Sequence, residues 1–463
     1  MIENDTAKKI IVLGAGISGL TAAERLARRY GDKVLVLEKN NFVGGLAATR
    51  SHEGLKFDLG SHRIHGAVSS KVYTYLNKTL GVNLHRRPRR GILYFRGKYF
   101  NYPPNLLNLL KVVTLKRSVG YVLDYFKTFR HPRNYDNYQD LILKRVGKKI
   151  YTIFYKDFAR KLWGVDPQKI AVEGIRRRGI PTSIAFLIRS FNTKNRYFFY
   201  PSYGIGEIAA RLEEKIYAHH GKVLKTVIVK RFTLQNGKIT HITIEDEKGI
   251  EQEIEVSLVV STIPIDEVYR LFFAEEAPSL TWRDVRLFYV HIDETLKHNN
   301  ETFYFPSLDI TIGRVSDIGK YSPHLNPGLK GTLLTIEIPA FKGDGIWKMD
   351  SGALLELCLN DLLKTKILEK YPKVVRYFTF ELEKAYPVYA IGWRERFFLM
   401  YDKLIKIPNL FIIGRKGLFL HCNIDHCIIQ GLTLADFIAK GSWGNKQLWN
   451  KKAAEFFSFS ARD

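Results

Sequence analysis

Three glycines near the start of the chain, Gly14, Gly16 and Gly19, have the G-x-G-x-x-G spacing that brings a bare backbone close to a phosphate. The first glycine permits a tight turn, the second lets the backbone approach a pyrophosphate, and the third lets a helix pack against a strand. Glu38 follows about 20 residues further on, where an acidic side chain binds a ribose hydroxyl in such sites. The pattern predicts a dinucleotide site with Ser18 as a further contact, and it leaves NAD and FAD both open.

The elements that must position these residues are a strand, a helix and a second strand. Residues 10–13 are an apolar run into the glycine turn, residues 20–27 continue as an amphipathic helix, and residues 33–37 lead to Glu38. Phosphates would lie at the helix N-terminus, where free N–H groups and the helix dipole favour negative charge. A strand, turn and helix without a ligand is the alternative, and an acid at this distance argues against it.

A second glycine pair discriminates between the two cofactors. Gly44 and Gly45 offer another place where backbone can approach a ligand closely. The run from Glu38 to Thr49, followed by residues 57–62, resembles the extended FAD fingerprint of the amine oxidase, phytoene desaturase and protoporphyrinogen oxidase superfamily. The resemblance implies non-covalently bound FAD, with further contacts from Lys39, Leu46, Gly60, Ser61, His62, Val229, Gly414, Arg415, Asn423 and Ile424.

The resemblance also implies the fold. The expected class is α/β, with a Rossmann-like FAD-binding domain of the glutathione reductase type, a β-meander, and an inserted α+β substrate or cap domain. The 463 residues suffice for two or three domains. The predicted ranges are 1–75, 200–270 and 385–440 for the FAD-binding domain, 76–199 for a helical cap, 271–384 for an α+β substrate region, and 441–463 for a basic tail.

A third glycine pair, Gly204 and Gly206, formally matches G-x-G-x-x-A and is a candidate nicotinamide site. Pro201 and Ser202 interrupt the approach to this pair, and the strand expected over 222–229 ends without a ribose-binding acid. We therefore expect no built-in nicotinamide site. The alternating segments 222–229 and 239–247, with a turn signal at 235–238, predict the β-meander instead.

Several segments show a narrower resemblance, to the UDP-galactopyranose mutases and related protoporphyrinogen oxidase-like proteins. It implies that His62 lies close to the flavin, although Ser61 stands where the mutase loop has a glycine. It implies substrate contacts from Trp163, Arg177, Arg178, Tyr304, Arg314, Tyr321, Tyr386 and His421. Four residues are predicted to be catalytic: His62, Arg314, Tyr321 and Tyr386.

The chemistry of this set suits an anionic substrate. Arginine provides a planar fork for phosphate, and tyrosine hydroxyls donate hydrogen bonds without adding charge. Two positions depart from the eukaryotic mutases, because Ala159 replaces a uridine-contacting asparagine and His421 replaces a tyrosine. The register of the arginine run 176–178 is ambiguous by one residue, and a solvated basic face is the alternative for each of its members.

Composition bounds the partners. Lys and Arg outnumber Asp and Glu by 72 to 46, a net charge of +26, which favours an anionic partner. No nucleic-acid module is evident, so we expect no nucleic-acid partner, whereas the apolar and basic stretch 106–117 is a candidate for peripheral contact with an anionic membrane. Three cysteines give no disulfide framework, and no metal site is predicted. A polar start and no long apolar run favour a cytoplasmic protein.

Three functional hypotheses follow. The first is an oxidoreductase in which an anionic organic substrate passes a hydride to flavin N5. The second is a redox-neutral mutase in which reduced flavin N5 attacks a nucleotide-diphosphate sugar and displaces the diphosphate. The third, of another class, is a flavin-binding membrane-surface protein. Ala159 and His421 favour the first over the second, and the sequence leaves the substrate and the oligomeric state open.

Overall fold

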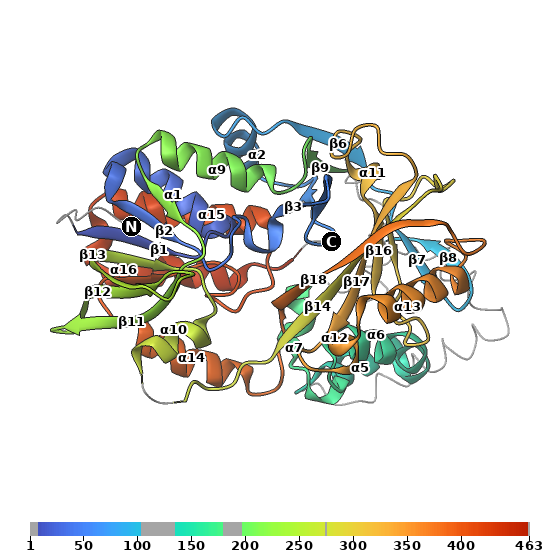
Figure 1. The fold of residues 1–463 in the computed structure, drawn as a ribbon. Coiled ribbons are helices and arrows are strands. Elements are labelled where there is room, and N and C mark those ends of the chain that lie inside the picture. Colours follow the sequence, from blue (N-terminus) through green and yellow to red (C-terminus); the bar gives the residue numbers. More distant parts are fainter. Residues whose placement is uncertain (1–7, 103–134, 179–196, 274–275, 462–463) are drawn as a thin grey trace.

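The computed structural model describes residues 8–102, 135–178, 197–273 and 276–461. It has the expected α/β fold, arranged in two lobes (Figure 1). The first lobe holds a sheet with a parallel core between layers of helices, and the second holds a mostly antiparallel sheet with helices against it. The stretch 106–117, proposed for a membrane contact, lies outside the described residues.

The sheet of the first lobe has a parallel core because its strands are apolar along their length. β1 (Lys9–Leu13) and β2 (Val34–Leu37) are buried at every position, as is typical of parallel strands covered on both faces. The strand order is β10-β2-β1-β13-β12-β11, and β19 (Leu410–Ile412) pairs with β13 (Glu251–Ser261). Segments from the start, the middle and the end of the chain therefore share one sheet.

The structure confirms the β-meander and corrects its first strand. β11 (Ile228–Gln235) and β12 (Lys238–Glu245) form a hairpin whose turn residues, Asn236 and Gly237, have φ of 50° and 73°, as a tight hairpin turn requires. The strand expected over 222–229 is broken. β10 (Lys222–Leu224) pairs with β2, and the chain then turns at Thr226, whose φ is 58°, before β11 begins.

Helices cover both faces of this sheet (Figure 1). α1 (Ile17–Tyr30), α9 (Glu207–Ala218) and α15 (Ile424–Ala439) share one face, and α10 (Ile265–Phe272) and α14 (Trp393–Leu404) lie on the other. α1 and α15 are in direct backbone contact. A Cβ at Gly431 would lie 2.7 Å from the carbonyl oxygen of Ser18, so only glycine permits this approach.

The second lobe is built on a seven-stranded sheet. The second strand from one edge, β14 (Trp282–Ile292), is buried at every position. The other strands, from one edge to the opposite edge around β14, are β18 (Val374–Pro387), β17 (Thr332–Ala340), β16 (Arg314–Asp317), β15 (Thr302–Tyr304), β7 (Ile92–Phe95) and β8 (Lys98–Asn101). Its helices are α5 (Tyr138–Ile150), α6 (Lys156–Trp163), α7 (Val172–Arg178), α11 (Ile318–Tyr321), α12 (Gly345–Lys348) and α13 (Ser351–Lys364).

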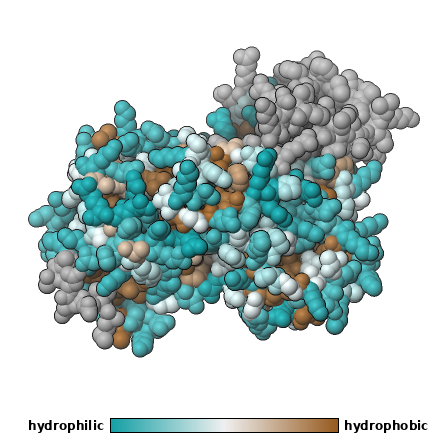
Figure 2. All heavy atoms as spheres, turned by 90° about the horizontal axis from the view of Figure 1, so that it is seen from above, coloured by the Kyte–Doolittle hydropathy of each residue, from teal (hydrophilic) through white to brown (hydrophobic). Residues whose placement is uncertain are grey.

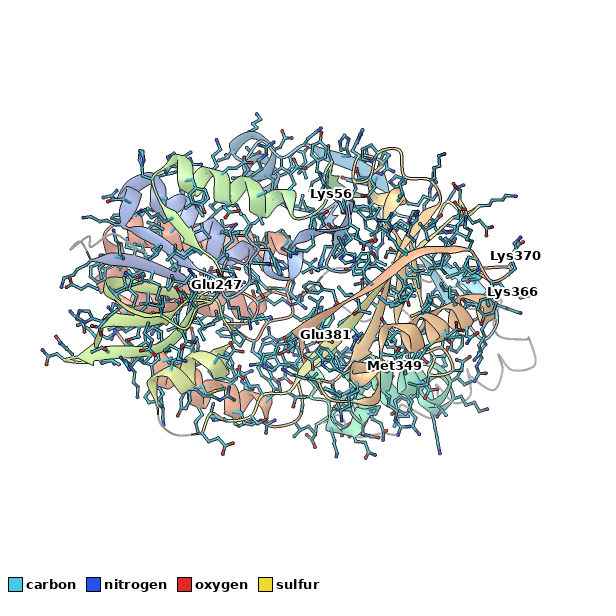
Figure 3. All side chains as sticks on the ribbon, in the orientation of Figure 1. Lys56, Glu247, Met349, Lys366, Lys370 and Glu381 are labelled. Carbon is cyan, nitrogen blue, oxygen red and sulfur yellow. The ribbon has the colours of Figure 1, made fainter. Side chains whose placement is uncertain are left out.

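Small elements join the two lobes. They are β3 (Thr49–His52) with β4 (Leu55–Asp58), the sheet of β5 (Ile64–His65), β9 (Tyr197–Pro201) and β6 (Leu84–Pro88), and the short helix α2 (Ser70–Thr74). Lys56 of β4, labelled in Figure 3, donates its backbone N–H to Asn326 Oδ1 at 2.8 Å, and its carbonyl accepts from Asn326 Nδ2 at 2.9 Å. These two bonds tie β4 to the loop before β17.

The segment expected as a basic tail is folded onto the first lobe. α16 (Lys446–Ala454) places Trp449 against Phe411 and Phe437, and Trp449 is only 1% exposed. Within the described residues, no helix has both the length and the apolar character that crossing a bilayer requires. The face shown in Figure 2 is mostly hydrophilic, with small hydrophobic patches separated by polar side chains.

Candidate cofactor and substrate site

The glycine turn between β1 and α1 has the geometry of a phosphate cradle. Gly14 has φ of 94°, and a Cβ there would lie 2.6 Å from Thr262 Oγ1. A Cβ at Gly19 would overlap the carbonyl oxygen of Gly14. A Cβ at Gly16 would instead meet nothing within 4 Å. The first and third glycines are therefore required by packing, whereas the second faces open space, as the approach of a pyrophosphate demands.

Two further features lie at this turn. Gly16 is the N-cap of α1 and provides no side-chain cap, so the first turn of the helix presents N–H groups that can bind an anion. The Oγ atom of Ser18 is buried and has no hydrogen-bond partner among the described residues. A buried hydroxyl without a partner is costly, and a phosphate oxygen would satisfy it. The residues of the turn therefore fit a bound dinucleotide.

The structure brings the other predicted glycines to the same place. The Gly44 N–H donates to the Ala15 carbonyl at 2.8 Å, and a Cβ at Gly45 would lie 3.4 Å from the Gly16 Cα. Gly414 has φ of 90°, and a Cβ there would lie 3.5 Å from the Ser18 Cβ. Three glycine segments far apart in the sequence therefore line one cradle.

Glu38 is held at the end of β2. It is buried, its Oε2 accepts the Ala15 N–H at 2.8 Å, and its Oε1 accepts the backbone and side-chain N–H groups of Asn40 at 2.9 and 2.7 Å. The acid lies beside the cradle, and its contact with a ribose stays a prediction. Lys39 is exposed, and Leu46 packs in a core cluster that includes β4 and β14 residues.

The chain returns to the cradle at the start of α15, where side chains cap the helix. Asn423 is the N-cap, its side chain accepts from the N3 backbone, and its own N–H donates to His426 Nδ1 at 3.2 Å. Ile424 is the first residue of the helix, and the sulfurs of the free cysteines Cys422 and Cys427 lie 3.9 Å apart. Val229 lies on β11 opposite Ile244.

The glycine pair at 204 and 206 is a packing feature. A Cβ at Gly204 would overlap Thr49 Oγ1, and one at Gly206 would overlap the Thr49 backbone nitrogen. The N–H groups that a phosphate would need are taken, because Gly206 N–H donates to Thr49 Oγ1 at 2.7 Å and Ile205 N–H donates to Asp58 Oδ1 at 3.2 Å. These contacts support the prediction that this pair holds no nicotinamide cofactor.

The predicted residues Arg314, Ser61 and His62 converge on a carboxylate that the sequence analysis did not single out. Glu337 of β17 accepts Arg314 Nε at 2.9 Å and Nη2 at 2.6 Å, and its Oε1 also accepts the Ser61 N–H at 2.7 Å. A Cβ at Gly60 would lie 3.3 Å from Glu337 Oε1, so the loop before His62 also needs glycine. Glu337 therefore offsets the charge of Arg314, and the contact of Arg314 with a substrate stays a prediction.

His62 is held as a neutral imidazole. Burial lowers its pKa to about 4, Glu337 opposes this shift, and the positive charges of Arg314 and Arg415 add to it. Its Nε2 lies 3.0 Å from the Leu59 carbonyl. Because a carbonyl can only accept, Nε2 carries the proton and Nδ1 is the acceptor side of the ring. At neutral pH, His62 therefore contributes hydrogen bonding without charge.

A second group, which we call the Arg415 cluster, combines the predicted residues Arg415, Tyr386, His421 and Arg177 with Tyr389, which the sequence analysis did not single out. The Arg415 Cζ lies 5.1 Å from the centroid of the Tyr386 ring, which stacks on His421 at 5.5 Å. The Tyr389 hydroxyl accepts the His421 N–H at 2.8 Å, and the Arg177 Cζ lies 5.5 Å from the Tyr389 ring. The cluster begins one residue after Gly414, so it adjoins the cradle.

The Arg415 cluster carries positive charge that no described carboxylate offsets. The bonds recorded for Arg415 go to the carbonyls of Cys422 and Ala385 and to His421 Nδ1. Arg177 stacks on aromatic rings, and its Nη1 is buried without an acceptor among the described residues. A buried guanidinium nitrogen without an acceptor is costly, so this cluster is suited to bind an anion.

Three other predicted residues are placed differently. Trp163 is 1% exposed and packs against Tyr138 in the core of the helical region, so it is a core side chain here rather than an open substrate contact. Tyr321 is 4% exposed, and its hydroxyl lies 2.6 Å from Thr302 Oγ1. Tyr304 is partly buried and accepts Arg63 Nη2 at 2.8 Å. The side chain of Arg178 lies outside the described part of the chain.

Sequence reasoning missed the buried acids of the site. Glu337 is the lone acid in the apolar run of β17, and an isolated charge in such a run was the available signal. Asp58 accepts Thr49 Oγ1 at 2.6 Å and the Tyr200 hydroxyl, and burial raises its pKa to about 6. Arg63 pairs with Glu301 at 3.2 Å, a contact that only the folded chain shows.

Comparison with known proteins shows which proteins this chain resembles. A 201-residue segment is 23% identical to the dTDP-fucopyranose mutase of Escherichia coli and covers 42% of this chain and 50% of that protein. The matched segment thus spans about half the length of that relative. A reduced UDP-galactopyranose mutase structure has a TM-score of 0.76 at 19% identity, covering 95% of this chain and 98% of that chain.

A putative protoporphyrinogen oxidase from Exiguobacterium sp. 255-15 has a TM-score of 0.72 at 16% identity, covering 94% of this chain and 99% of that chain. These structural likenesses show a shared fold. The family model for flavin-containing amine oxidoreductases matches residues 17–439, from the first turn of α1 to the end of α15. With the cradle and the family match together, the chain belongs to the flavin-containing amine oxidoreductases, a family of flavin-dependent enzymes.

Proposed function

We propose that the protein is an oxidoreductase that holds FAD non-covalently and oxidises an organic substrate carrying an anionic group. One observation carries this proposal: the Arg415 cluster adjoins the cofactor cradle and has two arginines whose charge no described carboxylate offsets. A bound flavin supplies the hydride acceptor for such a reaction. The chain supplies binding, orientation and a dry environment.

The residues of the site divide this work. Arg177 and Arg415 bind the anionic group of the substrate, and the Tyr386 and His421 rings form an apolar wall beside it. Neutral His62 contributes a hydrogen-bond acceptor at Nδ1 without adding charge. The Glu337–Arg314 pair fixes the loop that carries Ser61 and His62, because Glu337 holds both the guanidinium and the Ser61 N–H.

Non-covalent attachment rests on the cysteines near the cradle. Cys422 is only 2% exposed, and both sulfurs face each other as free thiols at 3.9 Å. Cys422 is therefore not an open nucleophile for a flavin ring, and the Cys427 sulfur lies against it. We expect acid precipitation of the yellow protein to leave all flavin in the supernatant, identified as FAD by mass spectrometry. Flavin that stays with the precipitate would contradict this part of the proposal.

The test of substrate binding uses anaerobic reduction of the bound flavin by a panel of amines, alcohols and reduced rings with and without acidic groups. We expect bleaching by acidic members. Arg177→Met and Arg415→Met should each weaken kcat/KM by about 10- to 100-fold, the worth of one charged hydrogen bond. Arg394→Met is the matched control, since Arg394 stacks on Phe398 on exposed α14. Equal loss in the control, or none in the two variants, would refute the assignment.

A mutase acting on a nucleotide-diphosphate sugar is the second candidate, because the same cluster suits a diphosphate and the sequence resembles a dTDP-sugar mutase. The neutralised Arg314 and the buried Trp163 argue against it. Incubation of the reduced protein with dTDP-fucopyranose and with UDP-galactopyranose, followed by chromatography, separates the two hypotheses. Furanose products without net consumption of reductant would replace the oxidoreductase with the mutase.

A further inference from the structure

A second set of arginines, outside the Arg415 cluster, lies where the loop after His62 meets β6. It consists of Arg63, Arg87 and Arg89, and we call it the Arg89 group. Side chains alternate along a strand, so Arg87 and Arg86 project to opposite faces of β6, and Arg89 follows directly after the strand ends at Pro88. The Arg86 Cζ accordingly lies 3.9 Å from the Tyr197 ring on the opposite side.

Aromatic rings join this group to the predicted substrate site. The Arg89 Cζ lies 5.5 Å from the Tyr102 ring, and that ring lies 4.3 Å from the Tyr304 ring. Tyr304 accepts Arg63 Nη2 at 2.8 Å and is directly opposite Arg314 in the β15–β16 pair. A Cβ at Gly91 would lie 3.4 Å from Tyr304 Cε2, so the backbone beyond Arg89 rests against the tyrosine.

Two members of the group, Arg87 and Arg89, have no carboxylate partner among the described residues. Glu301 pairs with Arg63 at 3.2 Å and also accepts the Arg90 N–H at 2.7 Å. Arg87 donates Nη2 to the Lys320 carbonyl at 2.9 Å, which is uncharged. No ion pair to Arg87 or Arg89 occurs among the residues that the structure describes, so the charge of these two guanidinium groups has no described counterion.

Hydrogen-bonding capacity is unused at the same place. The Nε and Nη2 atoms of Arg89 and the Nε atom of Arg87 are shielded from solvent and have no acceptor among the described residues. Buried donors of a charged group cost free energy when they form no hydrogen bond. The guanidinium fork of arginine matches two oxygens of a carboxylate or phosphate. An oxyanion seated here would satisfy the donors and offset the charge in one step.

We propose that the Arg89 group binds a second anionic group of the substrate, a phosphate or a carboxylate, separate from the one at the Arg415 cluster. The substrate class is therefore a molecule with two acidic groups spaced apart. The inference rests on the proposed function for the identity of the ligand as substrate. The presence of the oxyanion site itself does not depend on the reaction.

The test measures oxyanion binding to the flavin-loaded protein by isothermal titration calorimetry, with inorganic pyrophosphate, inorganic phosphate and succinate as separate probes. We expect the wild type to bind at least one of them, and Arg89→Met and Arg87→Met to weaken that binding about tenfold or more. Arg86→Met is the matched control on the other face of β6 and should bind within twofold of the wild type. The preferred probe separates a phosphate from a carboxylate ligand.

Arg89→Lys guards against misfolding, because it keeps the charge and loses only the fork. It should show wild-type circular dichroism and intermediate affinity. Binding unchanged in Arg89→Met, or no binding of any probe by the wild type, would overturn the proposal. The Arg177→Met variant tests separately whether a probe binds at the Arg415 cluster. If only Arg177→Met loses binding of a probe, the Arg89 site fails and the proposed function survives. If only the Arg89 variants lose binding, the Arg89 site stands and the proposed anion site at the Arg415 cluster fails.

Discussion

Replacing Glu337 by alanine is the sharpest perturbation that the structure offers. Glu337 and Arg314 are 9% and 21% exposed and share two hydrogen bonds, of 2.9 and 2.6 Å, and Glu337 also holds the Ser61 N–H at 2.7 Å. Removing one partner of a buried ion pair leaves the other charge uncompensated, which costs about 3–5 kcal/mol. We expect Glu337→Ala to lower the free energy of unfolding by this amount.

The assay is urea unfolding at pH 7, followed by far-ultraviolet circular dichroism and by tryptophan fluorescence, so that coincident transitions establish two-state behaviour. The control is Glu383→Ala, which breaks the exposed 2.8 Å pair with Lys342 and should cost less than about 1 kcal/mol. The double variant Arg314→Met with Glu337→Leu removes both charges and should recover most of the loss. A loss below about 1 kcal/mol in Glu337→Ala would refute the reasoning.

The same pair fixes a pH dependence. Burial raises the pKa of Glu337, but the charge of Arg314 and the hydrogen bonds to Arg314 and Ser61 outweigh it and leave the pKa below its usual value. The folded state therefore binds the proton less readily than the unfolded state. This contribution to stability is complete above the ordinary glutamate range and is lost as the pH falls through it and below.

Three further predictions concern the cradle, the histidine and the C-terminal helix. Gly16→Ala should fold with near-normal stability and lose most of its flavin, measured by absorbance after desalting, because a Cβ there meets no protein atom within 4 Å and projects into the expected pyrophosphate position; full retention of flavin would contradict the cradle. An NMR titration should give His62 a pKa of about 4, so the stability that comes from its low pKa is complete above the ordinary histidine range and is lost as the pH falls toward 4; a His62 pKa above 6 would contradict its burial. Trp449→Ala should lower the unfolding free energy by about 3–5 kcal/mol in the urea assay, since Trp449 is 1% exposed. An effect below about 1 kcal/mol would contradict the conclusion that residues 441–463 pack onto the first lobe.

Much of the cofactor lobe could be predicted because its signals are local. The Gly14–Gly19 turn, the Gly44-Gly45 pair and the Asn236-Gly237 turn each constrain a few adjacent residues, and the structure forms each of them. The break between β10 and β11 was missed, because it depends on hydrogen bonds between residues 226–227 and the loop after β2. Strand periodicity alone cannot reveal a contact of that kind.

The substrate side was predicted less well because its residues act through partners distant in sequence. The sequence predicted Arg314 as a contact for an anionic substrate but gave no sign of its ion pair with Glu337, 23 residues away. Trp163 matched a family motif, yet its burial against Tyr138 is a property of packing in this chain. Arg89 lies in a run of basic residues that resembles a solvated face, and only the neighbouring tyrosines make it a site. The residue types were enough to predict an anionic ligand, whereas the role of each residue depends on contacts that form only in the folded chain.

The cradle is closed by three segments that lie far apart in the chain, and this has a consequence for biosynthesis. The Thr262 hydroxyl bonds to the Leu13 carbonyl 249 residues away, and Gly414 packs against Thr262 and Ser18. At ~5–20 residues per second, the ribosome needs on the order of tens of seconds to reach Gly414 after Gly14 has emerged. Until then the first turn of α1 lacks its contact with Gly414. The cradle is therefore complete only after the segment around Gly414 has been synthesised.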